Sequence, residues 1–255
     1  MHRAEKLSVV PDSVAVLAST TPWHVAVMWL MVIALLSYLV GSIPSAYIIV
    51  RAVTGEDVTT HGSGNVGAMN VKRTTGSWGW FAVAMIADML KGLVPVVLGK
   101  AIVDIPVIQP VGMWMTAVDG GGTAGAAAAP MAAVLGAVLG HNYSLWMALK
   151  KHHFARTGQG LATGAGALLG YDWRYFLAAA AVGLTVIAIT RYMLAGQVAA
   201  AVTLPVTALA LHSPDWPFAL LMGAIVYGAH HRRFVGLLRG QEPKLYLRDR
   251  QGPRG

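Results

Sequence analysis

The chain of 255 residues contains no cysteine, and only 12% of its residues are charged. The lack of cysteine excludes disulfide bonds, zinc sites with thiolate ligands and a cysteine nucleophile. Soluble domains carry about 25% charged residues, so this low content argues against an ordinary soluble protein. Apolar residues instead make up 56% of the chain. Several windows approach the roughly 20 apolar residues that cross a bilayer. The sequence therefore predicts an all-α, polytopic membrane bundle.

The apolar windows predict about seven transmembrane helices, at residues 25–50, 78–99, 124–140, 160–171, 175–189, 195–211 and 216–229. The fourth window spans about 18 Å at 1.5 Å per residue, which is shorter than a bilayer core of about 30 Å. Because this window is rich in glycine and alanine, we expect it inside the bundle. Three regions follow from these windows: an outer arm at 1–24, a membrane domain at 25–236 and a basic cytoplasmic tail at 237–255.

Basic residues are distributed unevenly between the two sides of this predicted bundle. Four lie on one side: Arg3, Lys6, Lys100 and Arg174. Fourteen lie on the other side: Arg51, Lys72, Arg73, Lys150, Lys151, Arg156, Arg191, Arg232, Arg233, Arg239, Lys244, Arg248, Arg250 and Arg254. The rule that positive loops stay inside places the fourteen, and the C-terminus, in the cytoplasm. The net charge of +8 then fits anionic lipid headgroups better than nucleic acid.

One polar loop, "THGSGNVGAMNVKR" at 60–73, interrupts the apolar sequence. It contains a G-x-G-x-x-G pattern, but neither a buried strand before it nor a βαβ unit around it, so it is a weak dinucleotide fingerprint. Glycines nevertheless let backbone N–H groups turn towards an anion. Asn65 and Asn70 add amide donors, and Arg73 can hold a phosphate with two hydrogen bonds. The loop is either a phosphate-binding element or a flexible turn whose charges only set the orientation.

Two ionisable residues fall inside the second predicted helix. Asp88 and Lys91 are three positions apart, so they share one helix face. Charged residues at membrane depth are costly and usually mark a functional interior, although the two could also neutralise each other for packing. Pro95 lacks the N–H that would bond to the carbonyl of Lys91, so we expect a kink there.

The third cytoplasmic loop repeats the chemistry of the first. Gly158 and Gly160 precede a predicted helix start, where an anion is favoured. His141 ends the preceding helix and could be a base, a phosphate donor or an interfacial histidine. His152 and His153 belong to a basic run without a neighbouring carboxylate, which indicates a headgroup-facing surface rather than a metal site. We expect no metal and no cofactor.

Six blocks of this sequence occur in the order that is typical of one family: "GSIPSAYIIVR" (41–51), "GSGNVGAMNVKR" (62–73), "DMLKGLVPV" (88–96), "GH" (140–141), "GQGLAT" (158–163) and "QEPK" (241–244). In these blocks the chain resembles the bacterial membrane acyl-phosphate:glycerol-3-phosphate acyltransferases. The resemblance covers about residues 30–245. It implies a multi-pass protein of the bacterial inner membrane that has its active site on the cytoplasmic face. It also implies an enzyme of phospholipid biosynthesis, with membrane lipids around it.

The resemblance implies that an acyl group moves from acyl phosphate to the sn-1 hydroxyl of glycerol 3-phosphate, giving lysophosphatidic acid and phosphate. It assigns catalytic roles to Ser42, Arg51, Asn65, Asn70, Arg73, Lys91 and His141. It assigns phosphate binding to Gly62, Ser63, Gly64, Gly67, Arg156, Gly158, Gln159, Gly160 and Thr163. Ser45, Glu242 and Lys244 also match family positions. The sequence has no H-x4-D motif, so it gives no support to the histidine–aspartate acyltransferase mechanism.

Departures from the family pattern concentrate in the third loop. Arg156 stands where the family has one lysine, but Gln159 replaces a second lysine, and several residues are inserted before it. Losing a charge-stabilising donor costs about 3 kcal/mol or more, and we expect Lys150, Lys151 or His153 to compensate. Two alternatives stay open. One is a relative with another acceptor or without activity. The other is a lipid-binding or transport protein, for which a buried Asp–Lys pair would also be suitable.

Overall fold

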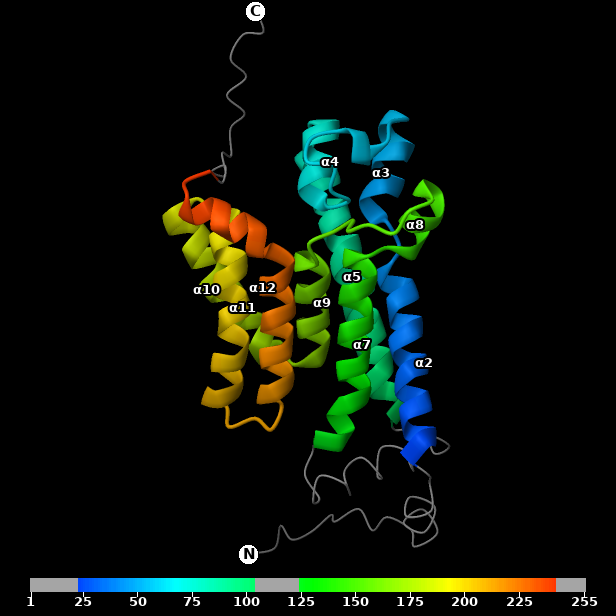
Figure 1. Ribbon diagram of the computed structural model, residues 1–255, viewed down its shortest axis with the longest axis vertical. Helices are drawn as coiled ribbons and strands as arrows, with labels where there is room; N and C mark the ends of the chain where they lie inside the picture. Colours follow the sequence, from blue (N-terminus) through cyan, green and yellow to red (C-terminus); the bar gives the residue numbers. More distant parts are fainter. Residues whose placement is uncertain (1–22, 104–123, 242–255) are drawn as a thin grey trace, which may run out of the picture.

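The computed structural model describes residues 23–103 and 124–241, and all the regular structure within them is helical (Figure 1). Its long helices are α2 (Trp23–Gly41), α5 (Trp78–Val103), α7 (Ala124–Asn142), α10 (Trp173–Thr190), α11 (Met193–Ala210) and α12 (Trp216–Leu238). Its shorter elements are α3 (Ser45–Thr54), the 3-10 turn η1 (Val58–Thr60), α4 (Ala68–Thr75), α8 (Leu145–Lys151) and α9 (Leu161–Tyr171). The all-α prediction is confirmed.

Five segments are long and apolar enough to cross a membrane: Val27–Thr54, Trp78–Ile102, Ala128–Lys151, Trp173–Thr190 and Met193–Ala210. Two shorter apolar helices, Leu161–Tyr171 and Trp216–Gly228, stand beside them in the bundle (Figure 1). The protein is therefore a multi-pass membrane protein, while seven crossings, and the region boundaries at 24 and 236, stay predictions. Most of the predicted outer arm and most of the predicted tail lie outside the described residues.

The first predicted span, 25–50, is not one continuous helix. α2 ends at Gly41 and α3 begins at Ser45, so the chain turns between them. Pro44 stands at the N-cap of α3; it has no N–H to donate and disfavours helical backbone at Ile43 before it. The G-S-I-P stretch thus explains the break. It places α3 beyond the bundle, at the same end as α4 and α8 (Figure 1).

Glycines bring several helix pairs into backbone contact. A Cβ on Gly136 or Gly140 of α7 would come closer than 3.0 Å to backbone carbonyl groups of α2. A Cβ on Gly92 of α5 or Gly166 of α9 would overlap carbonyl oxygens of the facing helix in the same way. Small residues allow such close approach in membrane bundles. The twelve-residue window expected inside the bundle is α9, which packs against α5 and α7.

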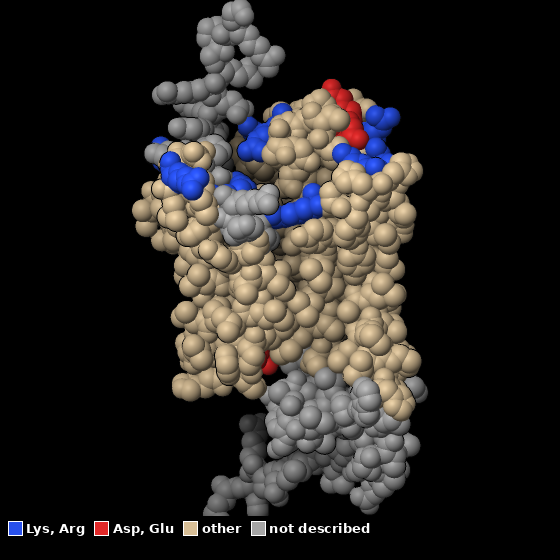
Figure 2. Space-filling view, in the orientation of Figure 1, with Lys and Arg blue, Asp and Glu red and all other residues tan. Residues whose placement is uncertain are grey.

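The two ends of the bundle differ in charge. Figure 2 shows Lys and Arg side chains gathered at the end that carries α3, α4 and α8, above a wide belt that shows no charged side chain in this view. Many large apolar side chains of α2, α5 and α10 are exposed along this belt. The loops 55–67 and 152–160 also lie at this end, together with the last turns of α12 (Figure 1). The two glycine-rich sequences are therefore brought to one face.

Candidate functional site

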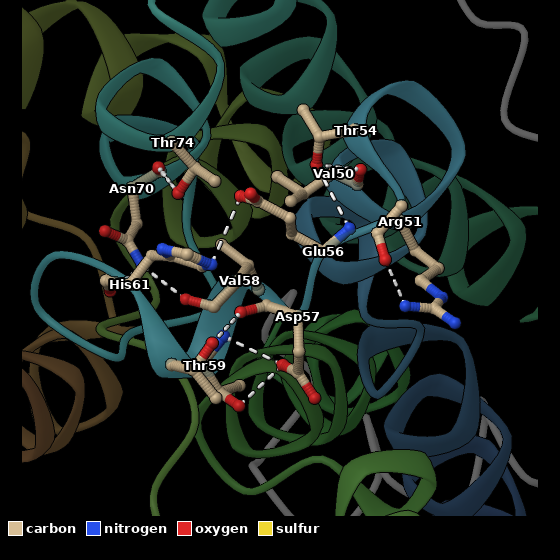
Figure 3. A network of polar contacts seen from close by, with 12 residues as sticks. Val50, Arg51, Thr54, Glu56, Asp57, Val58, Thr59, His61, Asn70 and Thr74 are labelled. Carbon is tan, nitrogen blue, oxygen red and sulfur yellow. Dashed lines mark hydrogen bonds and ion pairs between the residues drawn. The ribbon is translucent and has the colours of Figure 1, made fainter.

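The first glycine-rich loop is held in shape by a buried asparagine. Nδ2 of Asn70 donates to the carbonyl oxygens of Val58 and His61 at 2.8 and 3.0 Å, and its Oδ1 accepts from the N–H of Ser63 at 3.3 Å (Figure 3). Gly62 and Gly64 have φ of +54° and +68°, which glycine adopts most readily. The amide of Asn70 thus fixes the loop, and a contact between this residue and a ligand stays a prediction.

The basic residues near this loop differ in their surroundings. Arg73 is exposed, and its Cδ lies beside Gly62, so the guanidinium group can reach over the loop. Arg51 is exposed as well, but it donates to the carbonyl oxygen of Gly55 at the end of α3 (Figure 3). Nζ of Lys72 lies 5.1 Å from the centre of the Trp78 ring, a cation–π distance. Asn65 is partly buried within the loop. Arg73 is therefore the best placed of these cations for an anion on the loop.

A charged cluster is buried below the loop, on α5 and α7. Nζ of Lys91 lies 2.8 Å from Oδ1 of Asp88, and both side chains are under 10% exposed. The same Nζ donates to the carbonyl oxygen of Ile43 at 2.8 Å, in the break between α2 and α3. Nδ1 of His141 is 3.9 Å from Asp88. Asp88, Lys91 and His141, which the sequence singled out separately, therefore lie together in the fold. α5 continues as a helix through Pro95.

The break between α2 and α3 is also fastened to the third loop. Oγ of Ser144 donates to the carbonyl oxygen of Ser42, and the N–H of Leu145 donates to Oγ of Ser42 at 3.4 Å. Ser144 caps α8 by accepting from Met147. Ser42 is fully buried by these contacts. The predicted site residue Ser42 thus joins the break to α8, within the same end of the bundle.

The third loop forms the start of α9 against the end of α7. Thr157 donates from its N–H to the carbonyl oxygen of Asn142 at 2.8 Å and from its hydroxyl to that of His141 at 3.1 Å. Gly158 is packed on His141, where a Cβ would lie 2.7 Å from the carbonyl oxygen and closer still to the imidazole. Gly160, with φ of +74°, caps α9. Both glycines are needed for this close packing.

Three buried polar atoms at this helix start have no hydrogen-bond partner: Thr163 Oγ1, Asn142 Oδ1 and His141 Nδ1. Buried polar atoms are normally paired, and a helix N-terminus presents free N–H groups and a positive dipole end. The hydroxyl of Thr163 and the N–H groups can donate to a negatively charged ligand, whereas Oδ1 of Asn142 can only accept a hydrogen bond. Nε of Arg156 donates to the carbonyl oxygen of Gly158 at 3.0 Å, so its positive charge lies beside the same turn. Gln159 is partly buried.

The two loops are joined directly, which the sequence did not indicate. The N–H of Val66 donates to the carbonyl oxygen of Thr157 at 2.8 Å. Lys150 pairs with Asp57 at 3.1 Å, and Lys151 contacts the hydroxyl of Thr59. The compensation predicted for Lys150 and Lys151 in place of Gln159 finds no support here, because both lysines are directed to η1. His153 lies against the carbonyl oxygen of Lys151.

The pKa of Asp57 reflects these contacts. Partial burial raises it, but hydrogen bonds from the hydroxyl and N–H of Thr59 and the contact with Lys150 lower it to about 2. Burial lowers the pKa of Arg156, and a nearby Arg233 lowers it further, while Tyr143 raises it. Asp57 is a structural contact of the first loop that sequence reasoning missed, and its only signal was an acidic residue before the glycine-rich loop.

Some predictions fall outside these contacts. Glu242 and Lys244 lie outside the described residues, so their place relative to the site is a prediction only. Ser45 is buried at the first turn of α3, and Gly67 is the N-cap of α4. Ser63 is exposed at the tip of the first loop. In the described ranges 23–103 and 124–241, no three His, Asp or Glu residues are grouped as they would be around a metal ion.

Comparison with known proteins gives a consistent picture. The family model described as glycerol-3-phosphate acyltransferase matches residues 31–240. The glycerol-3-phosphate acyltransferase of Desulforudis audaxviator is 34% identical over 216 residues, covering 84% of this chain and 94% of that protein. The enzyme of the same description from Thermus thermophilus is 36% identical over 222 residues, covering 86% of this chain and 96% of that protein.

A solved structure shares the fold. It is a crystal structure of PlsY (YgiH), an integral membrane glycerol 3-phosphate acyltransferase, in its glycerol 3-phosphate form. It matches with a TM-score of 0.65 and 24% identity, over 85% of this chain and 96% of that chain.

Proposed function

The chain belongs to the glycerol-3-phosphate acyltransferase family, and from this premise we propose that it acylates glycerol 3-phosphate at a membrane surface. It is an acyltransferase by family, and the product expected from the sn-1 hydroxyl is lysophosphatidic acid. The observation that carries this proposal is the meeting of two glycine-rich loops, through Val66 and Thr157, beside the buried Lys91 and the start of α9.

For the acyl donor we propose acyl phosphate. The attacking hydroxyl oxygen forms an ester bond with the carbonyl carbon, the bond from that carbon to the phosphate oxygen breaks, and phosphate leaves. The hydroxyl proton passes to a phosphate oxygen, so no protein base is required, and the glycerol hydroxyl itself is the nucleophile. The absence of an H-x4-D motif and of cysteine supports this donor, since the acyl group arrives already activated. Positioning and charge stabilisation are then the main contributions of the protein.

Two phosphate groups must approach each other in this reaction, and positive charge must offset their repulsion at a boundary of low dielectric constant. We propose that Arg73 and the backbone of 62–67 hold one phosphate. The start of α9, with Thr163 and Arg156, holds the other. Lys91 lies on α5, where the neighbouring Gly92 packs on Thr163, and contributes charge to the second phosphate. The unpaired hydroxyl of Thr163 and the free N–H groups at this start support a phosphate there.

We place this site in the cytoplasm, at the inner membrane of a bacterium, because the basic residues favour that side. The chain lacks cysteine, so single cysteines can report the orientation. A cysteine at the exposed His152 should resist a membrane-impermeant maleimide in intact cells, whereas one at Ser213, between α11 and α12, should react. The reverse pattern would contradict the orientation.

The decisive experiment supplies the purified protein with palmitoyl phosphate and glycerol 3-phosphate and measures lysophosphatidic acid. Product formation supports the proposal, and Arg73→Ala serves as the matched variant with lower activity. Activity with acyl-CoA but not with acyl phosphate would refute the donor. A folded protein that is silent with both donors would instead favour the lipid-binding or transport alternative.

A further inference from the structure

The segment 143–157 connects α7 to α9 and contains α8. It holds two lysines, one arginine and two histidines but no Asp or Glu. One stripe of α8 faces the protein: Met147 is 1% exposed and packs with Val50, Val58 and other apolar residues of α3, η1 and α4. Lys150 and Lys151, three and four positions later, lie on the same stripe and contact η1.

The other side of the segment is apolar and exposed. Leu149 is 60% exposed, Trp146 45%, Phe154 64% and Tyr143 39%. The rings of Tyr143 and Phe154 are stacked, with centroids 5.9 Å apart and planes at 11°. We call these four side chains the α8 apolar surface. Clustered exposed apolar side chains of this size usually mark an interaction site.

Two hydrogen bonds fix this surface at the end of the apolar belt. Nε1 of Trp146 donates to the carbonyl oxygen of Leu39 at 3.3 Å, and the hydroxyl of Tyr38 donates to the carbonyl oxygen of Tyr143 at 2.8 Å. Leu139, one turn before Tyr143 on α7, is exposed, as is Leu36 on α2. The α8 apolar surface therefore continues the lipid-facing sides of α2 and α7 where the basic end begins.

We propose that the α8 apolar surface docks into the lipid leaflet on the basic side of the bundle, so that α8 is an interfacial anchor. Tyr and Trp side chains favour the membrane–water interface. The apolar side of α8 can be buried at the boundary between the headgroups and acyl chains of an anionic leaflet, while its two lysines contact η1. The absence of any carboxylate in 143–157 removes repulsion from such a leaflet.

This inference is independent of the proposed chemistry. The basic run 150–153 was interpreted from the sequence as a surface that faces lipid headgroups, and the structure assigns the contact with lipid to the aromatic and leucine side chains beside it. Lys150 and Lys151 face η1, and the aromatic side chains face outward. Because Lys150 is paired with Asp57, lipid docking of α8 also holds η1, which leads into the first glycine-rich loop.

The test measures how deep each side chain lies in a bilayer. Nitroxide labels are attached to single cysteines introduced as Leu149→Cys and Phe154→Cys, and the protein is placed in nanodiscs that contain phosphatidylglycerol. Leu36→Cys on α2 serves as the lipid-facing control and Glu56→Cys, exposed beside η1, as the aqueous control. At positions 149 and 154, oxygen should relax the label several-fold more than a water-soluble nickel complex does, as at position 36.

Labels at 149 and 154 that behave like the label at 56 would overturn the proposal. Labels shielded from both relaxation agents would also overturn it, because they would indicate protein contact. The wild-type protein provides a second measurement that needs no substitution. Lipids with a photoreactive group in the acyl chain should label residues 146–154, and labelling confined to α2, α5 and α10 would contradict the anchor.

Discussion

Replacing Lys91 with methionine tests whether the buried charges act on substrate or only on packing. Nζ of Lys91 lies 2.8 Å from Oδ1 of Asp88 and donates to the carbonyl oxygen of Ile43 at 2.8 Å. Only 6% of the Lys91 side chain is exposed. Removing one partner leaves the other charge buried, which costs about 3–5 kcal/mol. For a protein of this size, that loss lowers the midpoint of thermal unfolding by roughly 6–20 °C. Tryptophan fluorescence in detergent would follow the transition.

The double variant Asp88→Leu/Lys91→Met separates the two roles. A buried ion pair can often be replaced by apolar residues at little cost, so stability should largely return. Activity should stay about a hundredfold or more below wild type, because the positive charge proposed to stabilise the phosphates is gone. Recovery of both stability and activity would refute a role for Lys91 in catalysis. An unchanged unfolding midpoint in Lys91→Met would refute the ion-pair account itself.

Four further outcomes are expected. Gly158→Ala should lower stability by about 1–3 kcal/mol, since its Cβ would press on His141, and a thermal shift assay would detect it. Arg73→Ala should lower kcat/KM for glycerol 3-phosphate by roughly ten- to a thousandfold, and unchanged kinetics would leave the first loop as a mere turn. Gln159→Lys should raise kcat/KM if the substitution had weakened the site, as steady-state kinetics would show. Asp57 has its pKa lowered to about 2, so its contribution to stability is complete above about pH 4 and is lost as the pH falls towards 2. The stability difference between wild type and Asp57→Asn should therefore shrink over that range, and a constant difference would contradict the assignment.

The sequence predicted the helical windows well, because apolar length is a local property. It also indicated that α9 is short and inside the bundle. The break before Pro44 was missed, since the apolar window continues through it. The two loops could be assigned to one side from their charges, but their direct bond from Val66 to Thr157 joins residues far apart in sequence. Asn70 shows the same limit: its predicted contact with a ligand stays a prediction, while only the fold reveals that its amide holds the loop.

The glycine contacts between α7 and α2 limit which substitutions this chain can accept during evolution. At Gly136 and Gly140 the nearest atoms of the neighbouring helix are backbone carbonyl oxygens, which no side-chain substitution can remove. No second substitution on α2 can therefore accommodate a methyl group at either position, and a mutational scan should find α7 intolerant there. The outward residues of α2, such as Leu35 and Leu36, meet no such constraint and should exchange freely among apolar types. The side of this helix pair where α2 and α7 touch therefore tolerates almost no substitution, whereas the outward side of α2 tolerates many.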